Sequence, residues 1–308
     1  MEILDNREHG VIAILGMRGT GKTWFSVKLL KHLMEKVDIV YLIDVVGVYE
    51  DYLSEQDIDA VIIDIDDLVS AVDFFEFFKK VEHAQDTVKY KIVVYDISAL
   101  SRKEMVEFMD IFSEYLLRFK PKNKKVAVIC DEVGEYAEQE RGYYSSGFET
   151  LVRIGRNKNV LWIVLITQRP QKVNKHLLAL SDIYVIFRLM HNLDMDAVRN
   201  ILGYSKTDFT IHEQTIKHLA TGQYIVYDGM NLVAYNENDE QMQFSDAGVV
   251  QKRVYPETLR KEVLQKYDEG VSVKVLSQTY QIPYETIRTW IKTRKKKEVD
   301  KNGEDKAK

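Results

Sequence analysis

The sequence predicts an α/β domain built on a mainly parallel central sheet, followed by a small all-α module. Short runs rich in β-branched residues recur along the first part of the chain. They are apolar on both faces, as in strands that are buried between two layers of helices. Segments with helical periodicity lie between several of these runs, which favours an alternating strand–helix arrangement. The last part of the chain lacks such runs and is rich in Lys and Arg.

Helical periodicity is clearest at residues 24–36 and 103–119. The segment 222–236 differs, because Asp228-Gly229 between two apolar runs is typical of a hairpin turn. We expect this hairpin to close the first domain. The predicted strands of the parallel sheet are 11–16, 39–44, 60–65, 91–97, 125–132, 160–167 and 183–189.

The charge distribution supports two modules. The chain has 308 residues, of which 45% are hydrophobic and 30% charged, enough for one full core and a smaller one. Residues 252–297 carry 12 Lys/Arg against 5 Asp/Glu, whereas residues 1–251 carry 28 against 39. A basic segment on an acidic body indicates an anionic partner, although a solvated helix face with a Lys-rich tail explains the charge equally well. We expect a large α/β domain at 1–250, a linker at 251–256, a helical module at 257–297 and a disordered tail at 298–308.

Other features narrow the class of protein. No apolar run approaches the roughly 18 residues that span a bilayer. The N-terminus is charged within its first residues, unlike a signal peptide, so we expect a cytoplasmic protein. The single cysteine, Cys130, excludes an internal disulfide and a cysteine-based metal cluster. It lies within an apolar run and is expected to be a small core residue.

The segment GMRGTGKT follows the apolar run VIAIL directly. It fits the pattern G-x-x-x-x-G-K-[ST] in the required context of strand, turn and helix. Glycines let successive N–H groups face one phosphate group, and the helix N-terminus adds partial positive charge. We predict that Lys22 reaches the β- and γ-phosphates of ATP and that Thr23 places its hydroxyl on Mg²⁺. The residues predicted to bind the nucleotide are Gly16, Gly19, Thr20, Gly21, Lys22 and Thr23.

Four apolar runs end in aspartate, at Asp44, Asp64, Asp96 and Asp131. Only Asp131 is followed directly by a second acid, Glu132. ATP hydrolysis needs one carboxylate to hold hydrated Mg²⁺ and another to polarise the attacking water. We therefore predict that Asp131 binds Mg²⁺ through water and that Glu132 is the general base. An acid that merely starts a loop is a better interpretation of Asp64.

The run LWIVLITQRPQK ends a buried strand at an amide and a guanidinium instead of a turn of Gly, Asn or Asp. If this strand neighbours the one that ends at Asp131, its tip lies close to the γ-phosphate. Gln168 can donate to a phosphate oxygen and accept from water at once, which makes it a candidate γ-phosphate sensor. A polar strand terminus without a catalytic role is the alternative.

At these residues the chain resembles the FtsK–HerA superfamily of DNA-pumping ATPases. The segments GMRGTGKT, VAVICDEVGEYA, LVRIGRNKNVLWIVLITQRP and DIYVIFRL occur in that family's order. KIVVYDISALS is similar to its third strand, and LIDVVGVYEDY to its D-x-x-G-E-Y element. The resemblance spans roughly residues 10–236, and TQRP is its most discriminating part. It implies a RecA-like P-loop NTPase domain, a homo-hexameric ring, and ATP at the subunit interfaces.

The resemblance also implies site residues. In the family, the equivalent of Gln168 contacts the γ-phosphate region, and an arginine of one subunit reaches the ATP of the next. The segment VRIGRNKN carries that likeness through Arg153 and Arg156. We favour Arg156, because it lies closer to the strand that leads into the sensor. Two exposed arginines pairing with surface acids are the alternative.

One departure concerns the D-x-x-G-E-Y element. This chain has Val48 where the family often has Glu, while Asp44 and Tyr49 remain. The role of that glutamate is either absent here or covered by Asp44. Arg18, inside the phosphate loop, could contact nucleotide or face solvent, and it receives no role.

The C-terminal module is predicted to contain three short helices. Gly270 ends the first, and Ser272 is a good N-cap for the second. The apolar stripes are Leu259, Val263, Leu264 and Tyr267; Val273, Leu276 and Tyr280; and Ile287, Trp290 and Ile291. This pattern resembles the helix-turn-helix of transposases and resolvases, whose last helix enters the major groove. A three-helix bundle that binds protein is the alternative. The expected DNA contacts are Tyr284, Arg288, Thr289, Lys292, Arg294 and Lys295.

The sequence as a whole favours an ATP- and Mg²⁺-dependent motor that moves or packages double-stranded DNA, of viral or plasmid origin. A nuclease or portal partner is not identified. One rival is an AAA+-type replication initiator or transposition helper, although a hairpin-like stretch follows the core here instead of a helical lid. Another is a regulator in which ATP switches sequence-specific DNA binding. Glu132 argues against the regulator, because a pure switch does not need an activated water.

Overall fold

The structure is a computed structural model of the chain. It describes residues 4, 7–66, 71–88, 91–139, 142–245, 248–250, 257–280, 287, 288, 290, 291 and 294. The chain divides into two compact units, Met1–Gln251 and Lys252–Lys308. Each unit is described separately below.

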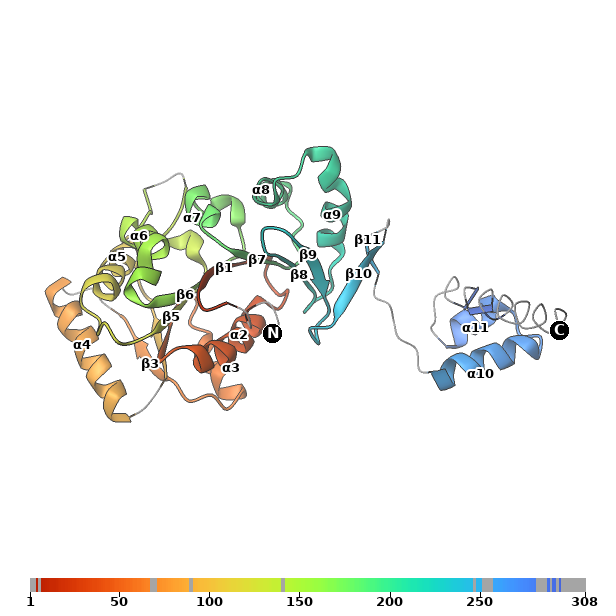
Figure 1. Ribbon diagram of the computed structural model, residues 1–308, viewed down its shortest axis with the longest axis horizontal. Helices are drawn as coiled ribbons and strands as arrows, with labels where there is room; N and C mark the ends of the chain where they lie inside the picture. Colours follow the sequence, from red (N-terminus) through yellow and green to blue (C-terminus); the bar gives the residue numbers. More distant parts are fainter. Residues whose placement is uncertain are drawn as a thin grey trace, which may run out of the picture. The chain divides into compact units, whose positions relative to one another are not determined.

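The first unit is built on one sheet whose described strands run in the order β11-β10-β9-β8-β7-β1-β6-β5-β2-β4-β3 (Figure 1). The strands from β7 to β3 are parallel, and those from β7 to β11 pair antiparallel. The mainly parallel sheet is therefore as predicted. The strands are β1 Gly10–Leu15, β2 Ile39–Asp44, β3 Val61–Asp64, β4 Ile92–Asp96, β5 Val126–Cys130, β6 Val160–Thr167, β7 Ile183–Ile186, β8 Tyr224–Tyr227, β9 Leu232–Tyr235, β10 Gln241–Ser245 and β11 Gly248–Val250.

The predicted hairpin at 222–236 is formed by β8 and β9, but it does not close the domain. The chain reverses again after β9, where the backbone N–H of Asn236 donates to the carbonyl of Glu240 at 3.0 Å. The side chain of Asn236 also accepts from the backbone N–H groups of Asn238 and Glu240, both at 2.9 Å. This turn carries β10 and β11 onto the edge of the sheet, because the asparagine supplies the acceptors that the reversing backbone needs.

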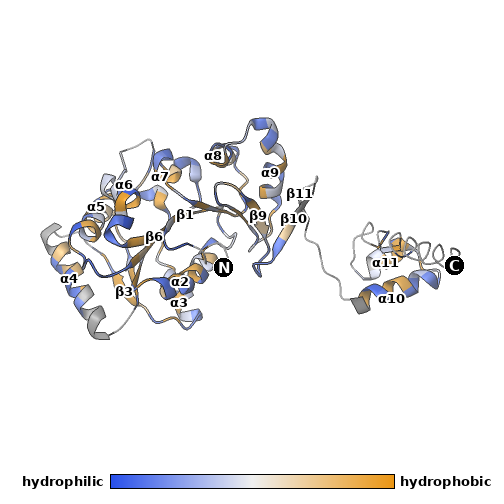
Figure 2. Cartoon of the chain, viewed as in Figure 1, coloured by the Kyte–Doolittle hydropathy of each residue, from blue (hydrophilic) through white to orange (hydrophobic). Residues whose placement is uncertain are grey.

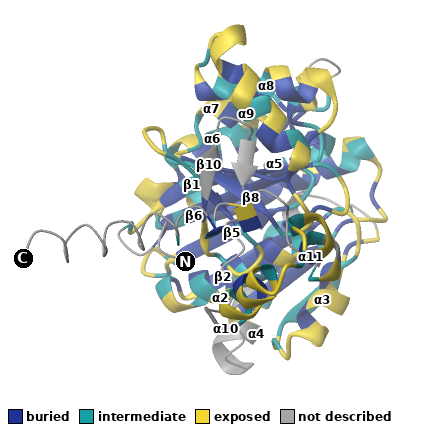
Figure 3. Ribbon diagram, turned by 90° about the vertical axis from the view of Figure 1, so that its right-hand side faces the viewer, coloured by how far each residue is buried: buried dark blue, intermediate teal, exposed yellow. Residues whose placement is uncertain are grey.

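Helices cover both faces of the sheet, so alternate residues of each central strand enter two separate cores. In β1, Ala13 and Leu15 join the core under α4 to α9, whereas Ile12 and Ile14 join the core under α2 and α3. Figure 2 shows the hydrophobic residues concentrated on the strands, and Figure 3 shows the same strands as buried. The helices are α2 Lys22–Lys36, α3 Tyr49–Glu55, α4 Ala71–Val88, α5 Arg102–Arg118, α6 Ser146–Ile154, α7 Lys175–Ala179, α8 Asn192–Leu202 and α9 Lys206–His218, with 3₁₀ turns η1 Val133–Glu135, η2 Gly155–Lys158 and η3 Pro170–Lys172.

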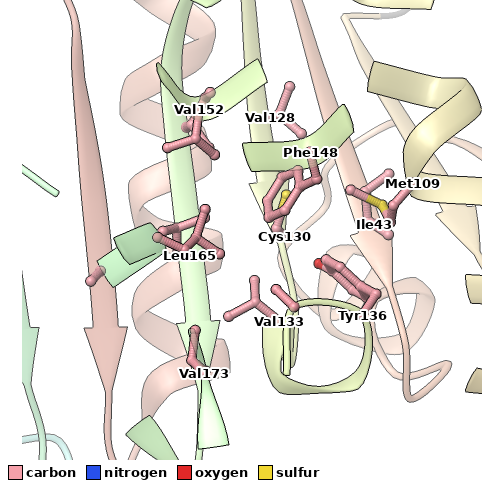
Figure 4. Packing of buried hydrophobic residues seen from close by; sticks show 14 of the residues in the cluster. Ile43, Met109, Val128, Cys130, Val133, Tyr136, Phe148, Val152, Leu165 and Val173 are labelled. Carbon is pink, nitrogen blue, oxygen red and sulfur yellow. The ribbon is translucent and has the colours of Figure 1, made fainter. Parts of the chain in front are cut away.

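Cys130, the last residue of β5, is fully buried. It lies among Val133, Tyr136, Phe148 and Leu165, as the close view in Figure 4 shows. Burial raises the pKa of its thiol above the ordinary value. Cys130 is the small core residue that its apolar run predicts.

The second unit contains α10 Glu257–Asp268 and α11 Val273–Thr279. Gly270 follows α10 with a φ of +94°, and the Ser272 hydroxyl accepts from the backbone N–H of Val275 at 3.4 Å, so the predicted break and N-cap are present. The residues of all three predicted apolar stripes form one hydrophobic cluster. The predicted linker and tail, and most of the third helix, lie outside the described residues.

Candidate functional site

The phosphate loop leaves the carboxyl end of β1 and enters α2. Gly19 and Gly21 have φ angles of +74° and +106°, in the left-handed region that favours glycine. A Cβ at Gly16 would lie 2.5 Å from the Cβ of Phe187, which is too close for any real side chain. The three glycines are therefore required by the path of the loop and by its packing against the residue that follows β7.

Two side chains fasten the loop onto itself. The Thr20 hydroxyl and the Lys22 ammonium donate to the carbonyl of Met17, at 2.8 and 3.0 Å, and both side chains are buried. Burial lowers the pKa of Lys22, and the nearby charges of Glu132 and Asp131 oppose that shift. A phosphate oxygen is a stronger acceptor than a neutral carbonyl. We therefore expect bound nucleotide to take over the Lys22 ammonium.

A segment that the sequence did not single out lies against the phosphate loop. The backbone N–H of Gly222 donates to the carbonyl of Thr20 at 3.0 Å, and the Thr221 hydroxyl donates to the carbonyl of Gly19 at 3.4 Å. A Cβ at Gly21 would lie 3.3 Å from the backbone of Gly222, so the two chains approach at a pair of glycines. The signal was present in the sequence as Thr221-Gly222 just before a predicted strand.

Asp131 and Glu132 follow β5 directly. Glu132 has a φ of +35°, a left-handed backbone conformation that is uncommon outside glycine. Both side chains are partly exposed. Desolvation, followed by the charges of Glu132 and Asp44, raises the pKa of Asp131 to about 7. Desolvation also raises the pKa of Glu132. The two predicted catalytic carboxylates are thus adjacent and lie close enough to Lys22 to interact with it electrostatically.

The tip of β6 holds Glu132 in place. The Thr167 hydroxyl donates to Glu132 Oε1 at 3.0 Å, and the backbone N–H of Gln168 donates to Glu132 Oε2 at 3.1 Å. Both bonds favour the ionised carboxylate and so lower its pKa against desolvation. Sequence analysis missed the role of Thr167, although a polar residue ending an eight-residue apolar run was a signal.

Because β6 pairs with β1 on one side and with β5 on the other, its tip lies between the phosphate loop and the two carboxylates. The backbone N–H of Gly16 donates to the carbonyl of Thr167 at 3.2 Å, which ties this tip to the loop. Within the described part of the chain, the side-chain amide of Gln168 makes no hydrogen bond, so it is available to a ligand. The predicted position of the sensor beside the γ-phosphate site is consistent with this topology.

The remaining residues of TQRP anchor the turn. Arg169 Nε lies 3.1 Å from Asp194 Oδ2 on α8, and Asp194 also accepts from the backbone N–H of Gln171 at 3.3 Å. Asp194 is buried, and Pro170 starts η3. A buried carboxylate needs such partners. Thr167, Arg169 and Pro170 therefore end this strand because each has a structural task.

The element that resembles D-x-x-G-E-Y is a structural turn at the end of β2. The buried carboxylate of Asp44 accepts four backbone N–H groups, those of Val46, Gly47, Val48 and Tyr49, at 3.0, 2.8, 2.8 and 2.8 Å. Four bonds use the whole acceptor capacity of a carboxylate. Asp44 is therefore committed to the start of α3 and does not replace a missing glutamate. Val48 contributes its backbone N–H and packs against the core.

Tyr49 links this turn to the phosphate-binding helix. Its hydroxyl lies 2.8 Å from the Ser26 hydroxyl, and Ser26 donates to the carbonyl of Thr23 at 2.7 Å. Burial raises the pKa of Tyr49 well above its ordinary value, so the phenol stays neutral and able to donate.

Arg153 and Arg156 lie near the amino ends of the parallel strands, at the end of the sheet opposite the phosphate loop. Both are exposed and line a hollow together with Gly10 and Val11 at the amino end of β1, whereas the phosphate loop follows its carboxyl end. At about 3.3 Å per residue, a six-residue strand separates the two ends by roughly 20 Å. Neither arginine forms an ion pair with a described residue. The structure thus keeps both away from the phosphate loop of their own chain.

The predicted DNA contacts lie in the second unit. Tyr284, Thr289, Lys292 and Lys295 fall outside the described residues. Arg288 is exposed. Arg294 donates to both carboxylate oxygens of Asp268, at 2.8 and 2.5 Å, so this guanidinium is occupied by an acid of α10.

Among the described residues, no group of three or more His, Cys, Asp and Glu side chains could hold a metal ion. The helices that the structure describes include none that is long and apolar enough to cross a bilayer.

No protein-family model and no curated protein matches this sequence. Solved structures do match its fold. The genome packaging NTPase B204 from Sulfolobus turreted icosahedral virus 2, in complex with AMPPCP, is 13% identical with a TM-score of 0.51, over 74% of this chain and 97% of that one. VirB4 of Thermoanaerobacter pseudethanolicus is 11% identical with a TM-score of 0.51, over 73% of this chain and 88% of that one. The chain shares the fold of these two proteins.

Proposed function

We propose that this protein is an ATP-driven motor that moves or packages double-stranded DNA. The observation that carries the proposal is the arrangement of side chains at the carboxyl ends of strands β1, β5 and β6. A phosphate loop, two adjacent carboxylates and an unoccupied amide at Gln168 meet around one site. Such a set of groups serves hydrolysis of a nucleoside triphosphate. The shared fold with a viral genome packaging NTPase supports DNA as the cargo.

In this proposal Glu132 accepts the proton of the attacking water. The bonds from Thr167 and Gln168 stabilise its ionised form and fix its direction, which a general base requires. Gln168 then orients the water or a γ-phosphate oxygen with its free amide. Lys22 neutralises charge on the β- and γ-phosphates.

The residues present fit a magnesium ion. Thr23, at the start of α2, offers a hydroxyl, and Asp131 offers a partly exposed carboxylate that is destabilised by desolvation and by neighbouring negative charge. A cation beside Asp131 would relieve that cost. A bound Mg²⁺ would supply positive charge that offsets the negative charge developing on the phosphates. Thr23 and Asp131, the latter through water, are the proposed protein ligands.

A ring of identical subunits, six by analogy with the family, would complete the site. The distance of Arg153 and Arg156 from their own phosphate loop supports a role in the neighbouring subunit, where a guanidinium would stabilise the transferred phosphoryl group. Arg156 is the favoured residue. The C-terminal unit, as a helix-turn-helix, would recruit the motor to DNA.

The steady-state ATPase rate, measured with and without long double-stranded DNA of random sequence, tests the proposal. Stimulation that rises with DNA length is the expected result for a translocating motor. A rate that ignores DNA, or that responds to one short sequence only, would instead indicate an initiator or an ATP-switched regulator.

Two variants test the catalytic assignments. Glu132→Gln should retain ATP binding and lose hydrolysis, and normal turnover in that variant would remove Glu132 as the base. Arg156→Ala should also lose hydrolysis, but a mixture with Lys22→Ala should regain part of it, because each subunit then supplies what the other lacks. Arg153→Ala in the same mixtures is the matched control, and no recovery with either arginine variant would refute catalysis in trans.

A further inference from the structure

A concentration of positive charge lies at the amino ends of strands β5 and β6, although the first unit is acidic as a whole. Four of the seven residues that join α5 to β5 are cations, and Arg118, the last residue of α5, is a fifth. Lys158, at the end of the 3₁₀ turn η2 before β6, is a sixth. We call this set the basic wall, and it consists of Arg118, Lys120, Lys122, Lys124, Lys125 and Lys158.

Contacts between the two segments make the basic wall one surface. The Asn159 side chain donates to the carbonyl of Lys122 at 2.7 Å, and the backbone N–H of Val126 donates to the carbonyl of Asn159 at 2.9 Å. Together the segments line a hollow of about 560 Å³. Its polar side chains are four cations and two asparagines, Arg118, Lys120, Lys122, Lys158, Asn157 and Asn159, so it is lined by hydrogen-bond donors and contains no carboxylate.

The loop is held in a defined shape by one of its own cations. The buried ammonium of Lys120 donates to the carbonyls of Lys124 and Pro121, at 2.9 and 3.2 Å. Lys122, Lys125 and Lys158 are exposed, and within the described ranges none of the three forms an ion pair. Arg118 pairs with Glu114 on the same helix at 3.0 Å, and the backbone N–H of Lys125 donates to the carboxylate of Asp38 at 2.7 Å.

The position of the basic wall separates it from the nucleotide of its own chain. Val126 begins β5 and Val160 begins β6, whereas the phosphate loop and the two carboxylates follow the carboxyl ends of strands in the same parallel sheet. The catalytic chemistry therefore does not account for these cations. Chance does not account for them well either, because residues 1–251 carry 28 Lys/Arg against 39 Asp/Glu.

The composition of the wall indicates the kind of partner. Lysine is depleted in the contact surfaces between proteins, whose buried centres are apolar. Surfaces that bind nucleic acid are wet and strongly positive, and unpaired cations there displace counterions from the phosphates. Lysine suits such contacts because its ammonium is a point charge without strict geometry.

We propose that the basic wall binds the phosphate backbone of double-stranded DNA without regard to sequence. The inference rests on the proposed motor function, since a motor must hold successive stretches of any sequence. It adds to that function a grip on the ATPase unit itself, apart from the predicted helix-turn-helix. Its contacts are to phosphates, which position a duplex but carry no sequence information.

The test uses the full chain with Lys122→Glu and Lys158→Glu combined. The matched control is Lys103→Glu with Lys206→Glu, two exposed lysines on α5 and α9 that change the net charge equally. Affinity for a random-sequence duplex is measured at several salt concentrations with a non-hydrolysable ATP analogue. The wall variant should bind at least about tenfold more weakly, and the slope of log K against log salt should shrink by about 2, whereas the control should keep both values.

Other measurements separate this proposal from the motor function. Affinity for the ATP analogue and ATPase activity without DNA should be unchanged in the wall variant, while stimulation by DNA should be lost. Equal duplex affinity and slope in the wall and control variants would overturn the proposal. A changed oligomeric state with unchanged DNA binding would also overturn it and assign the wall to a contact between copies. A wild-type chain that binds duplex through the wall but lacks ATPase activity would refute the motor alone.

Discussion

Asp44 and Asp131 stand at the ends of adjacent parallel strands, β2 and β5, yet their carboxylates have opposite surroundings. Asp44 accepts four backbone N–H groups and is buried within its turn. Asp131 has its pKa raised to about 7 by desolvation and by neighbouring negative charge, and its side chain remains partly exposed. A satisfied carboxylate stabilises a fold, whereas a destabilised and accessible one is prepared for a cation or a proton.

The difference shows that the same residue type at equivalent strand ends can have either role. What distinguishes them is the path of the chain just after the strand. After Asp44 the backbone turns so that successive N–H groups converge on the carboxylate. After Asp131 the chain places a second acid, Glu132, in a left-handed conformation and then forms η1.

The largest effect is expected from replacing Asp44, which should lower the stability of the fold. Asp44→Ala would leave four backbone N–H groups without their acceptor and should lower the free energy of unfolding by about 3–5 kcal/mol. Urea unfolding measures this. Asp44→Asn, which retains one acceptor oxygen, should fall between the variant and the wild type. A loss below about 1 kcal/mol for Asp44→Ala would contradict the structural role.

Asp131→Asn should instead raise the free energy of unfolding of the nucleotide-free protein. Because folding raises the pKa of Asp131, its contribution to stability is greatest below about pH 4 and is lost as the pH rises toward 7. Removing the charge should stabilise the nucleotide-free protein by roughly 2–3 kcal/mol more at pH 8 than at pH 5. Thermal unfolding at both pH values measures this.

The same Asp131→Asn variant should lose ATPase activity. One substitution would then raise the stability of the protein and remove its function. Wild-type-like stability at both pH values would mean that Asp131 is not destabilised in the fold. Asp64→Asn, at an exposed strand end, is the matched control and should change neither stability nor activity.

A smaller effect is expected at Thr167. Thr167→Val removes the hydroxyl that donates to Glu132, so the pKa of Glu132 should rise further. The ATPase rate should fall about tenfold near neutral pH, and the acid limb of its pH profile should move to higher pH. Thr167→Ser should preserve the profile. A reduced rate with an unmoved profile would limit Thr167 to a packing role.

The smallest effect is expected at Tyr49. Tyr49→Phe removes the contact with Ser26, which still donates to the carbonyl of Thr23, and should cost about 1 kcal/mol of stability. The ATPase rate at saturating ATP should not change, because this side chain braces the turn after β2 and does not reach the nucleotide. A loss of activity that exceeds the loss of folded protein would connect the Asp44 turn to the chemistry.

Much of this protein could be predicted from local sequence. Doubly apolar runs determine the buried parallel strands, because both faces of each strand must pack. The glycine pattern before Lys22 determines the phosphate loop, because glycine readily adopts the backbone angles at Gly19 and Gly21 and has no Cβ to clash with Phe187 at Gly16. The pair Asp131-Glu132 marked the strand end that the phosphate loop faces, where we propose the catalytic carboxylates to lie. The apolar stripes of the second unit form its cluster because helical spacing places them on one face.

Tertiary structure alone decided which polar groups meet. The strand order placed the tip of β6 between β1 and β5, so Thr167 reaches Glu132 across 35 positions of sequence. It also brought Thr221 and Gly222 against the phosphate loop, and joined the loop after α5 to η2 in the basic wall. Asp44 and Asp131 looked alike in sequence, because a carboxylate's partners depend on the three-dimensional path of the backbone around it. Periodicity and turn chemistry act over a few residues, whereas hydrogen bonds and desolvation depend on neighbours that only the folded chain supplies.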